Sequence, residues 1–203
     1  IIKSLTEQNK LTDELKEKVM AAETMSVLED IYLPYKPKRR TRATVAKEKG
    51  LEPLAQKLFE QGAFDIVEEA AKYIDEEKKV SNYEEALSGA RDIIAEWVNE
   101  NADVRAELRT LFFEKGAYRS KVVRGKDAEG IKYRDYFDWQ EPVKSIPSHR
   151  LLVVRRGEKE GVLMLRVIAP EEEAVRILNS YFLKAKTDAA EQVRLAIEDS
   201  YKR

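Results

Sequence analysis

The sequence contains no cysteine and only one histidine, His149, among its 203 residues. Without cysteine there are no disulfides, thiolate metal sites or cysteine nucleophiles. A lone histidine also argues against histidine-rich zinc sites and histidine-paired nucleophiles. We therefore predict no metal, no cofactor and no enzyme active site in this chain. His149 follows Pro147 and Ser148, where we expect it to form a structural hydrogen bond at the start of a helix.

Long apolar runs are also missing, since no stretch approaches the roughly 18 residues that a membrane span requires. With no visible signal peptide and no cysteine, these features predict a cytoplasmic protein with no membrane contact. Neither sign of charge is in excess, because 37 basic and 38 acidic residues give a net charge of −1. A 37% share of charged residues with 43% hydrophobic residues argues against both a disordered chain and a uniformly basic one.

Glycine and proline are scarce, at 8 and 6 residues, and helical spacing of apolar residues dominates. The strongest apolar stripe runs from Leu87 to Val98, and the pattern extends from Val104 to Gly116. The one clear strand pattern is residues 162–168, bounded by glycine and proline, although Val122-Val123 is compatible with another short strand. These patterns predict a mainly α multi-helix domain with a minor β element near 162–168.

A helix-turn-helix-like subregion is a further possibility within residues 26–60. Pro34 should stop the helix before it, and Gly50 should end the next helix in the left-handed conformation. Pro53 is tolerated in the first turn of the helix after that. Short helix, glycine and short helix fit this motif, but any compact helical domain shows the same pattern.

The main charge feature is a basic connector at residues 36–49, where seven cations and one glutamate give a net charge of +6. Its candidate nucleic-acid-binding residues are Lys36, Lys38, Arg39, Arg40, Arg42, Lys47 and Lys49. Such a cluster can neutralise phosphates and release counterions. Alternatively, it pairs with the acidic stretch at residues 65–77 or with another domain. Tyr32 and Tyr35 lie beside it, either to stack on bases or to pack.

Three blocks of the sequence resemble, in order, the Tex family of bacterial transcription accessory proteins. They are residues 28–44 with 46–54 (LEDIYLPYKPKRRTRAT, AKEKGLEPL), 120–126 with 133–138 (SKVVRGK, YRDYFD), and 146–150 with 156–163 (IPSHR, RGEKEGVL). The resemblance implies that residues 1–203 are the helical N-terminal to central region of a longer chain, with a helix-turn-helix-like part. An RNase-H-like domain, helix-hairpin-helix modules and an OB-fold RNA-binding domain would follow it.

The resemblance implies binding of RNA or DNA by the full-length protein, with the remaining domains of the same chain as further partners. The family is also similar to a eukaryotic elongation factor, which makes RNA polymerase or other transcription proteins plausible partners. We therefore expect a non-catalytic helical scaffold segment of a transcription accessory protein. Two alternatives stay open: an autonomous nucleic-acid-binding module through residues 36–49, and a docking surface for the transcription machinery.

Overall fold

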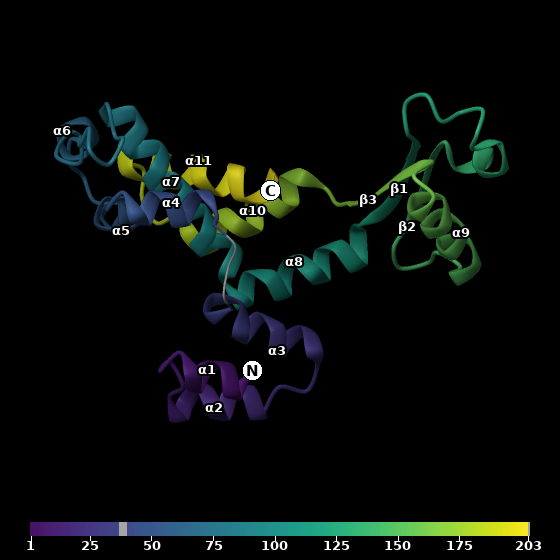
Figure 1. Cartoon of the computed structure of the whole chain (residues 1–203), viewed down its shortest axis with the longest axis horizontal. Helices are drawn as coiled ribbons and strands as arrows, with labels where there is room; N and C mark the ends of the chain where they lie inside the picture. Colours follow the sequence, from purple (N-terminus) through teal and green to yellow (C-terminus); the bar gives the residue numbers. More distant parts are fainter. Residues whose placement is uncertain (37–39, 203) are drawn as a thin grey trace. The chain divides into compact units, whose positions relative to one another are not determined.

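The computed structural model describes residues 1–36 and 40–202, most of which are helical (Figure 1). The chain divides into two compact units: unit 1 comprises Ile1–Ala106 and Val175–Arg203, and unit 2 comprises Glu107–Ala174. The predicted class, mainly α with a minor β element, is confirmed. In the part of the chain that the structure describes, no helix is long and apolar enough to cross a membrane.

Helices form nearly all of unit 1, and four of them pack around one long central helix. They are α1 (Ile2–Glu7), α2 (Asp13–Met20), α3 (Met25–Tyr32), the 3-10 helix η1 (Leu33–Tyr35), α4 (Arg42–Glu48), α5 (Glu52–Glu60), α6 (Ile66–Ala71), α7 (Tyr83–Glu100) and α11 (Asp188–Lys202). Two helices run across the division between the units: α8 (Ala102–Lys115) and α10 (Glu171–Phe182). The central helix is α7, against which α4, α5, α6 and α11 all pack.

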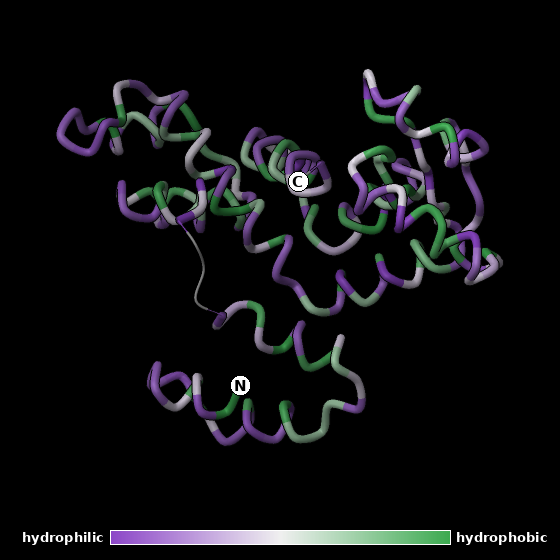
Figure 2. The backbone as a smooth tube through the Cα atoms, turned by 45° about the vertical axis from the view of Figure 1, so that its right-hand side comes forward, coloured by the Kyte–Doolittle hydropathy of each residue, from purple (hydrophilic) through white to green (hydrophobic). Residues whose placement is uncertain are grey.

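The apolar stripe predicted from the sequence is the reason for this arrangement. Ala90, Ile93, Ile94, Ala95 and Val98 of α7 are fully buried. Burying each larger aliphatic side chain contributes about 1.5–3 kcal/mol, so the neighbouring helices cover α7 on a wide face. Figure 2 shows the corresponding alternation of hydrophobic and hydrophilic residues along the helices.

Local signals for helix ends are also confirmed. Pro34 lies in η1, directly after the end of α3. Gly50 adopts a φ of +80°, in the left-handed region, between α4 and α5, and Pro53 lies in the first turn of α5. A short turn therefore separates α4 from α5.

The helical pattern that was expected to extend from α7 to Gly116 is interrupted at Asn101. This residue leaves the helical conformation with a ψ of 117°, and its side-chain Oδ1 accepts a hydrogen bond from the Val104 backbone N–H at 3.0 Å. An asparagine that caps the following helix satisfies a backbone donor that otherwise has no partner. The single long pattern is therefore two helices, α7 and α8.

Unit 2 contains a small antiparallel sheet, a 3-10 helix and one α-helix. Its elements are β1 (Ala117–Val122), η2 (Ile131–Tyr136), β2 (Asp138–Pro142), α9 (Ser148–Lys159) and β3 (Leu163–Ile168). The strand order is β2-β1-β3. The predicted strand at residues 162–168 is β3, whereas β2 was not predicted and β1 was predicted only at its end.

One face of this sheet is covered. Helix α9 packs against β3, and Tyr133, Val154, Val162 and Leu163 form the buried cluster there. The other face carries alternating polar residues, as expected for an antiparallel sheet with one solvated side. This polar alternation is why the sequence did not predict β1 and β2 clearly.

Candidate nucleic-acid interface

The basic connector runs from the end of η1 through α4. Of its seven candidate cations, the structure describes Lys36, Arg40, Arg42, Lys47 and Lys49, whereas Lys38 and Arg39 lie outside the described residues. Lys36 is exposed and forms no ion pair with the residues that the structure describes. It is the described cation of the connector that is most available to a ligand.

Arg40 and Arg42 are exposed and only loosely paired. Arg40 Nη2 lies 2.9 Å from Glu48 Oε2, and the Arg40 side chain is 71% exposed. Arg42 Nη1 lies 3.9 Å from Asp92 Oδ1, with the Arg42 side chain 69% exposed. Exposed ion pairs contribute only about 0–1 kcal/mol, so a phosphate can displace these carboxylates at little cost.

Lys47 has a different environment, because its partner is a mostly buried carboxylate of α7. Its Nζ lies 3.1 Å from Glu96 Oε1, and the Glu96 side chain is only 11% exposed. Thr41, which caps α4 through a hydrogen bond from the Thr44 N–H, also donates from its hydroxyl to Glu96 Oε2 at 3.2 Å. Glu96 therefore attaches α4 to α7 through contacts with Thr41 and Lys47.

Lys49 is also engaged, since its Nζ donates to the Lys79 carbonyl oxygen at 2.7 Å. Lys49 and Arg42 border a shallow groove of about 300 Å³ between α4 and α7, opposite Glu85 and Asp92. Cations and carboxylates thus line the same groove. A polyanion would meet repulsion inside it, so phosphate binding is favoured at the exposed N-terminal part of the connector.

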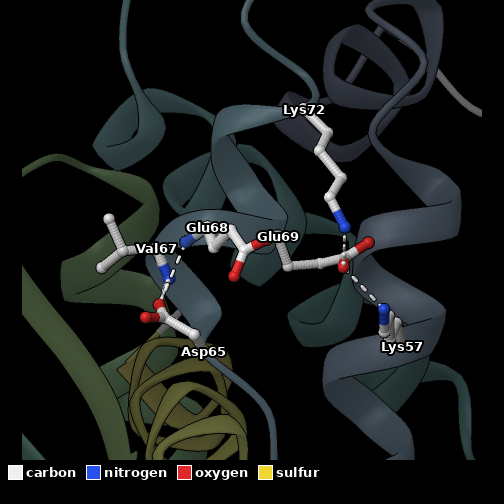
Figure 3. A network of polar contacts seen from close by, with 6 residues as sticks. All are labelled: Lys57, Asp65, Val67, Glu68, Glu69 and Lys72. Atoms are coloured by element: carbon white, nitrogen blue, oxygen red, sulfur yellow. Dashed lines mark hydrogen bonds and ion pairs between the residues drawn. The ribbon is translucent and has the colours of Figure 1, made fainter.

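The acidic stretch at residues 65–77 was one expected partner of the connector, but its central carboxylate has other partners (Figure 3). Glu69 Oε2 accepts hydrogen bonds from Lys57 Nζ at 2.6 Å and Lys72 Nζ at 2.8 Å. These bonds, from Lys57 first and then Lys72, lower the pKa of Glu69. Asp65 caps α6 by accepting from the Val67 and Glu68 N–H groups. The carboxylates that the described part of the connector meets are instead Glu48, Asp92 and Glu96.

The two tyrosines before the connector pack in unit 1. Tyr32 and Tyr35 lie against the buried cluster formed by Leu5, Leu15 and Val19. The Tyr32 hydroxyl is also within 2.9 Å of Ser4 Oγ. Of the two interpretations, packing is the one observed.

His149 is exposed at the start of α9, where no side-chain hydrogen bond caps the helix. The predicted structural hydrogen bond of His149 is not formed within the described residues, so this prediction was wrong. Within residues 1–36 and 40–202, no group of three or more histidine, cysteine or carboxylate side chains is placed to hold a metal ion.

Sequence reasoning missed a second basic surface, on the open face of the sheet in unit 2. We call it the β1–β3 basic face and define it by Arg119, Lys121 and Arg166. All three residues are exposed, and Arg119 lies directly opposite Arg166 in the strand register. The sequence feature that could have revealed this surface is the two-residue spacing of Arg119 and Lys121, which places both side chains on one face of a strand.

Comparison with known proteins gives consistent results. A family model described as Tex central region-like matches residues 63–200. The chain is 48% identical over 167 residues to "Protein tex" of Bordetella pertussis, covering 82% of the chain and 21% of that protein. It is 45% identical over 163 residues to "Transcriptional accessory protein Tex" of Neisseria gonorrhoeae, covering 80% and 21%. A human protein, "S1 RNA-binding domain-containing protein 1", is 25% identical over 177 residues, covering 82% and 17%.

These matches place the chain in a family whose members include a protein named as a transcriptional accessory protein. It belongs to the Tex family, as the three sequence blocks indicated, and residues 63–200 form the central region of that family. The chain spans about a fifth of the length of these bacterial relatives.

Proposed function

We propose that this chain is a non-catalytic helical scaffold segment of a cytoplasmic transcription accessory protein, and that the intact protein binds nucleic acid. The central observation is the position of α7, whose buried stripe is covered by α4, α5, α6 and α11. A charged side chain beside this stripe attaches α4 to α7, because Glu96 contacts both Lys47 and Thr41. The names of the relatives, which include a transcriptional accessory protein and a protein that contains an S1 RNA-binding domain, support the assignment to transcription and nucleic acid.

Within this scaffold, the basic connector contributes phosphate contacts through its exposed cations. Lys36, Arg40 and Arg42 carry this role in the described part of the chain, because they are exposed whereas Lys47 and Lys49 are partly buried. Since phosphate contacts position a protein without reading sequence, the connector would strengthen binding to any nucleic acid. The rest of the affinity would come from other parts of the intact protein.

The helix-turn-helix-like subregion at residues 26–60 is part of this proposal as a packing unit. In α5, Leu54, Ala55 and Leu58 are buried. The charged side chains of α5 are Glu52, Glu60 and Lys57, and the lysine is paired with Glu69. A recognition helix in the major groove needs donors near phosphates and base edges, so the charge on α5 favours packing over duplex recognition.

The connector is tested by replacing Lys38, Arg39, Arg40 and Arg42 with alanine in the intact protein. Binding to single- and double-stranded DNA and RNA is then measured by electrophoretic mobility shift. We expect a similar loss of affinity for all sequences. A matched control removes four exposed lysines from α1, α2 and the turn between them: Lys3, Lys10, Lys16 and Lys18. Equal affinities of the two variants would remove the connector from the binding surface.

The non-catalytic part of the proposal has its own test. The 203-residue chain is incubated with labelled DNA and RNA in the presence of magnesium or manganese, and we expect no cleavage. Metal-dependent cleavage that a point mutation in this chain abolishes would overturn the scaffold assignment.

A further inference from the structure

The open face of the sheet in unit 2 is a second charged surface, independent of the connector. Side chains alternate across a strand, so the residues opposite the covered face are Arg119 and Lys121 of β1, and Met164, Arg166 and Ile168 of β3. These five residues line a shallow hollow of about 270 Å³. The hollow therefore combines three cations with two apolar side chains.

The cations of the β1–β3 basic face have no ion-pair partner among the residues that the structure describes. Arg119, Lys121 and Arg166 form no ion pair with any residue in the described parts of the chain. Six other cations of unit 2 have carboxylate partners. These pairs are Lys115–Glu173, Lys126–Glu129, Lys132–Glu160, Lys144–Glu114, Arg150–Glu141 and Arg155–Glu158. Within the described residues, no ion pair therefore neutralises these three cations, although the carboxylate of Asp138 lies opposite Lys121 in the strand register.

The strand register places two of these cations directly opposite each other. Arg119 is the direct cross-strand partner of Arg166 on one side and of Gln140 on the other. Like charges directly opposite each other destabilise a sheet, and an anion held between the two guanidinium groups would remove that repulsion. Arginine binds phosphate in a bidentate manner. One carboxylate, Asp138, is opposite Lys121 at the edge of this face.

We propose that the β1–β3 basic face binds the backbone of a single-stranded nucleic acid. Arg119 and Arg166 contact phosphate, Lys121 contacts the next phosphate, and a base lies on Met164, whose side chain is 48% exposed. Faces that bind single strands combine cations with side chains on which unstacked bases lie, usually aromatic ones or arginine, and here the polarizable methionine sulfur can make favourable contacts with the ring of a base. A duplex keeps its bases stacked inside, so it would leave Met164 without a partner.

The test uses the 203-residue chain and fluorescence anisotropy with labelled oligouridylate and oligothymidylate at several salt concentrations. The test variant carries Arg119→Gln, Lys121→Gln and Arg166→Gln, and Arg166→Gln alone serves as a milder second variant. The matched control carries Lys126→Gln, Lys144→Gln and Arg155→Gln, which removes the same charge from ion-paired positions of unit 2. Circular dichroism confirms that each variant is folded.

We expect the triple variant to lower the slope of log affinity against log salt by about 1.4, because the face contacts two phosphates of a single strand and each contributes about 0.7. The control should leave the slope unchanged, and Arg166→Gln should lower it by less than half as much, because Arg119 still contacts the shared phosphate. Stronger binding of oligouridylate than oligothymidylate would identify RNA as the ligand, and the reverse order DNA.

Three outcomes would overturn the proposal. The first is equal slopes for the triple variant and the control, and the second is no binding of either oligonucleotide by the wild-type chain at low salt. The third is displacement of the oligonucleotide by poly-glutamate at equal charge concentration, which would assign the face to an acidic protein. None of these outcomes depends on the connector, which is intact in every variant.

Discussion

Gln61 joins the end of α5 to the loop between α10 and α11, and its replacement tests how the scaffold of unit 1 is held together. Its side chain is buried. Nε2 donates to the Phe182 carbonyl oxygen at 2.6 Å, and Oε1 accepts from the backbone N–H of Lys184 at 2.8 Å and of Ala185 at 3.3 Å. One amide side chain thus satisfies three backbone groups more than a hundred residues away.

The change Gln61→Ala removes these bonds and leaves the Phe182 carbonyl and the Lys184 N–H without the partners they have now. Each hydrogen bond contributes about 0.5–1.5 kcal/mol, and a buried group left unsatisfied costs more. We therefore expect a loss of about 2–3 kcal/mol in the free energy of unfolding. In a protein of this size that corresponds to a fall in Tm of about 4–12 °C.

Urea unfolding followed by circular dichroism measures this loss. The control is Gln56→Ala, the same substitution at an exposed position of α5, where we expect a change within about 0.5 kcal/mol. Gln61 also has a left-handed φ of 59°, so Gln61→Gly separates strain from hydrogen bonding. If the hydrogen bonds hold the loop, Gln61→Gly remains clearly destabilised. Wild-type stability of Gln61→Gly, or equal stability of Gln61→Ala and Gln56→Ala, would refute the reasoning.

Two further predictions concern stability. A carboxylate with a lowered pKa contributes stability above its unfolded pKa, and this is lost in acid. The pKa of Glu69 is held below 4.5 by Lys57 first and by Lys72, so Glu69→Gln should lower Tm near neutral pH and match wild type well below pH 4.5. A Tm difference that persists in acid would contradict this. Gly157→Ala would place a Cβ 2.6 Å from Leu163 Cδ1. Overpacking costs about 1–3 kcal/mol, which offsets the gain of about 1 kcal/mol from the higher helix propensity of alanine, so urea unfolding should show no increase in stability. An increase equal to the whole helix-propensity gain would mean that α9 packs less tightly against β3.

Local sequence signals predicted much of the fold. The left-handed Gly50, Pro53 in the first turn of α5 and the apolar stripe of α7 each depend on a few neighbouring residues. Such features follow from backbone conformation and helical spacing. The family resemblance was confirmed for the same reason, since it depends on continuous blocks of sequence.

Features that depend on distant residues were not predictable in this way. The partners of Arg42 and Lys47 come from α7, some fifty residues along the chain, and charge alone did not distinguish them from the acidic stretch at residues 65–77. Likewise, polar residues alternate with more buried residues along β1 and β2, because one face of their sheet is open to solvent. Asn101 ends one helix and caps the next through its side chain, and the spacing of hydrophobic residues does not predict such a cap.

The most direct test of the central claim is the salt dependence of nucleic-acid binding by the intact protein, with and without the connector cations. Removing one lysine or arginine that touches a phosphate should reduce the slope of log affinity against log salt by roughly one. We predict that replacing Lys38, Arg39, Arg40 and Arg42 with alanine lowers this slope and weakens binding similarly for all sequences, while the scaffold remains folded. An unchanged slope and affinity would contradict the proposed contribution of the connector to nucleic-acid binding.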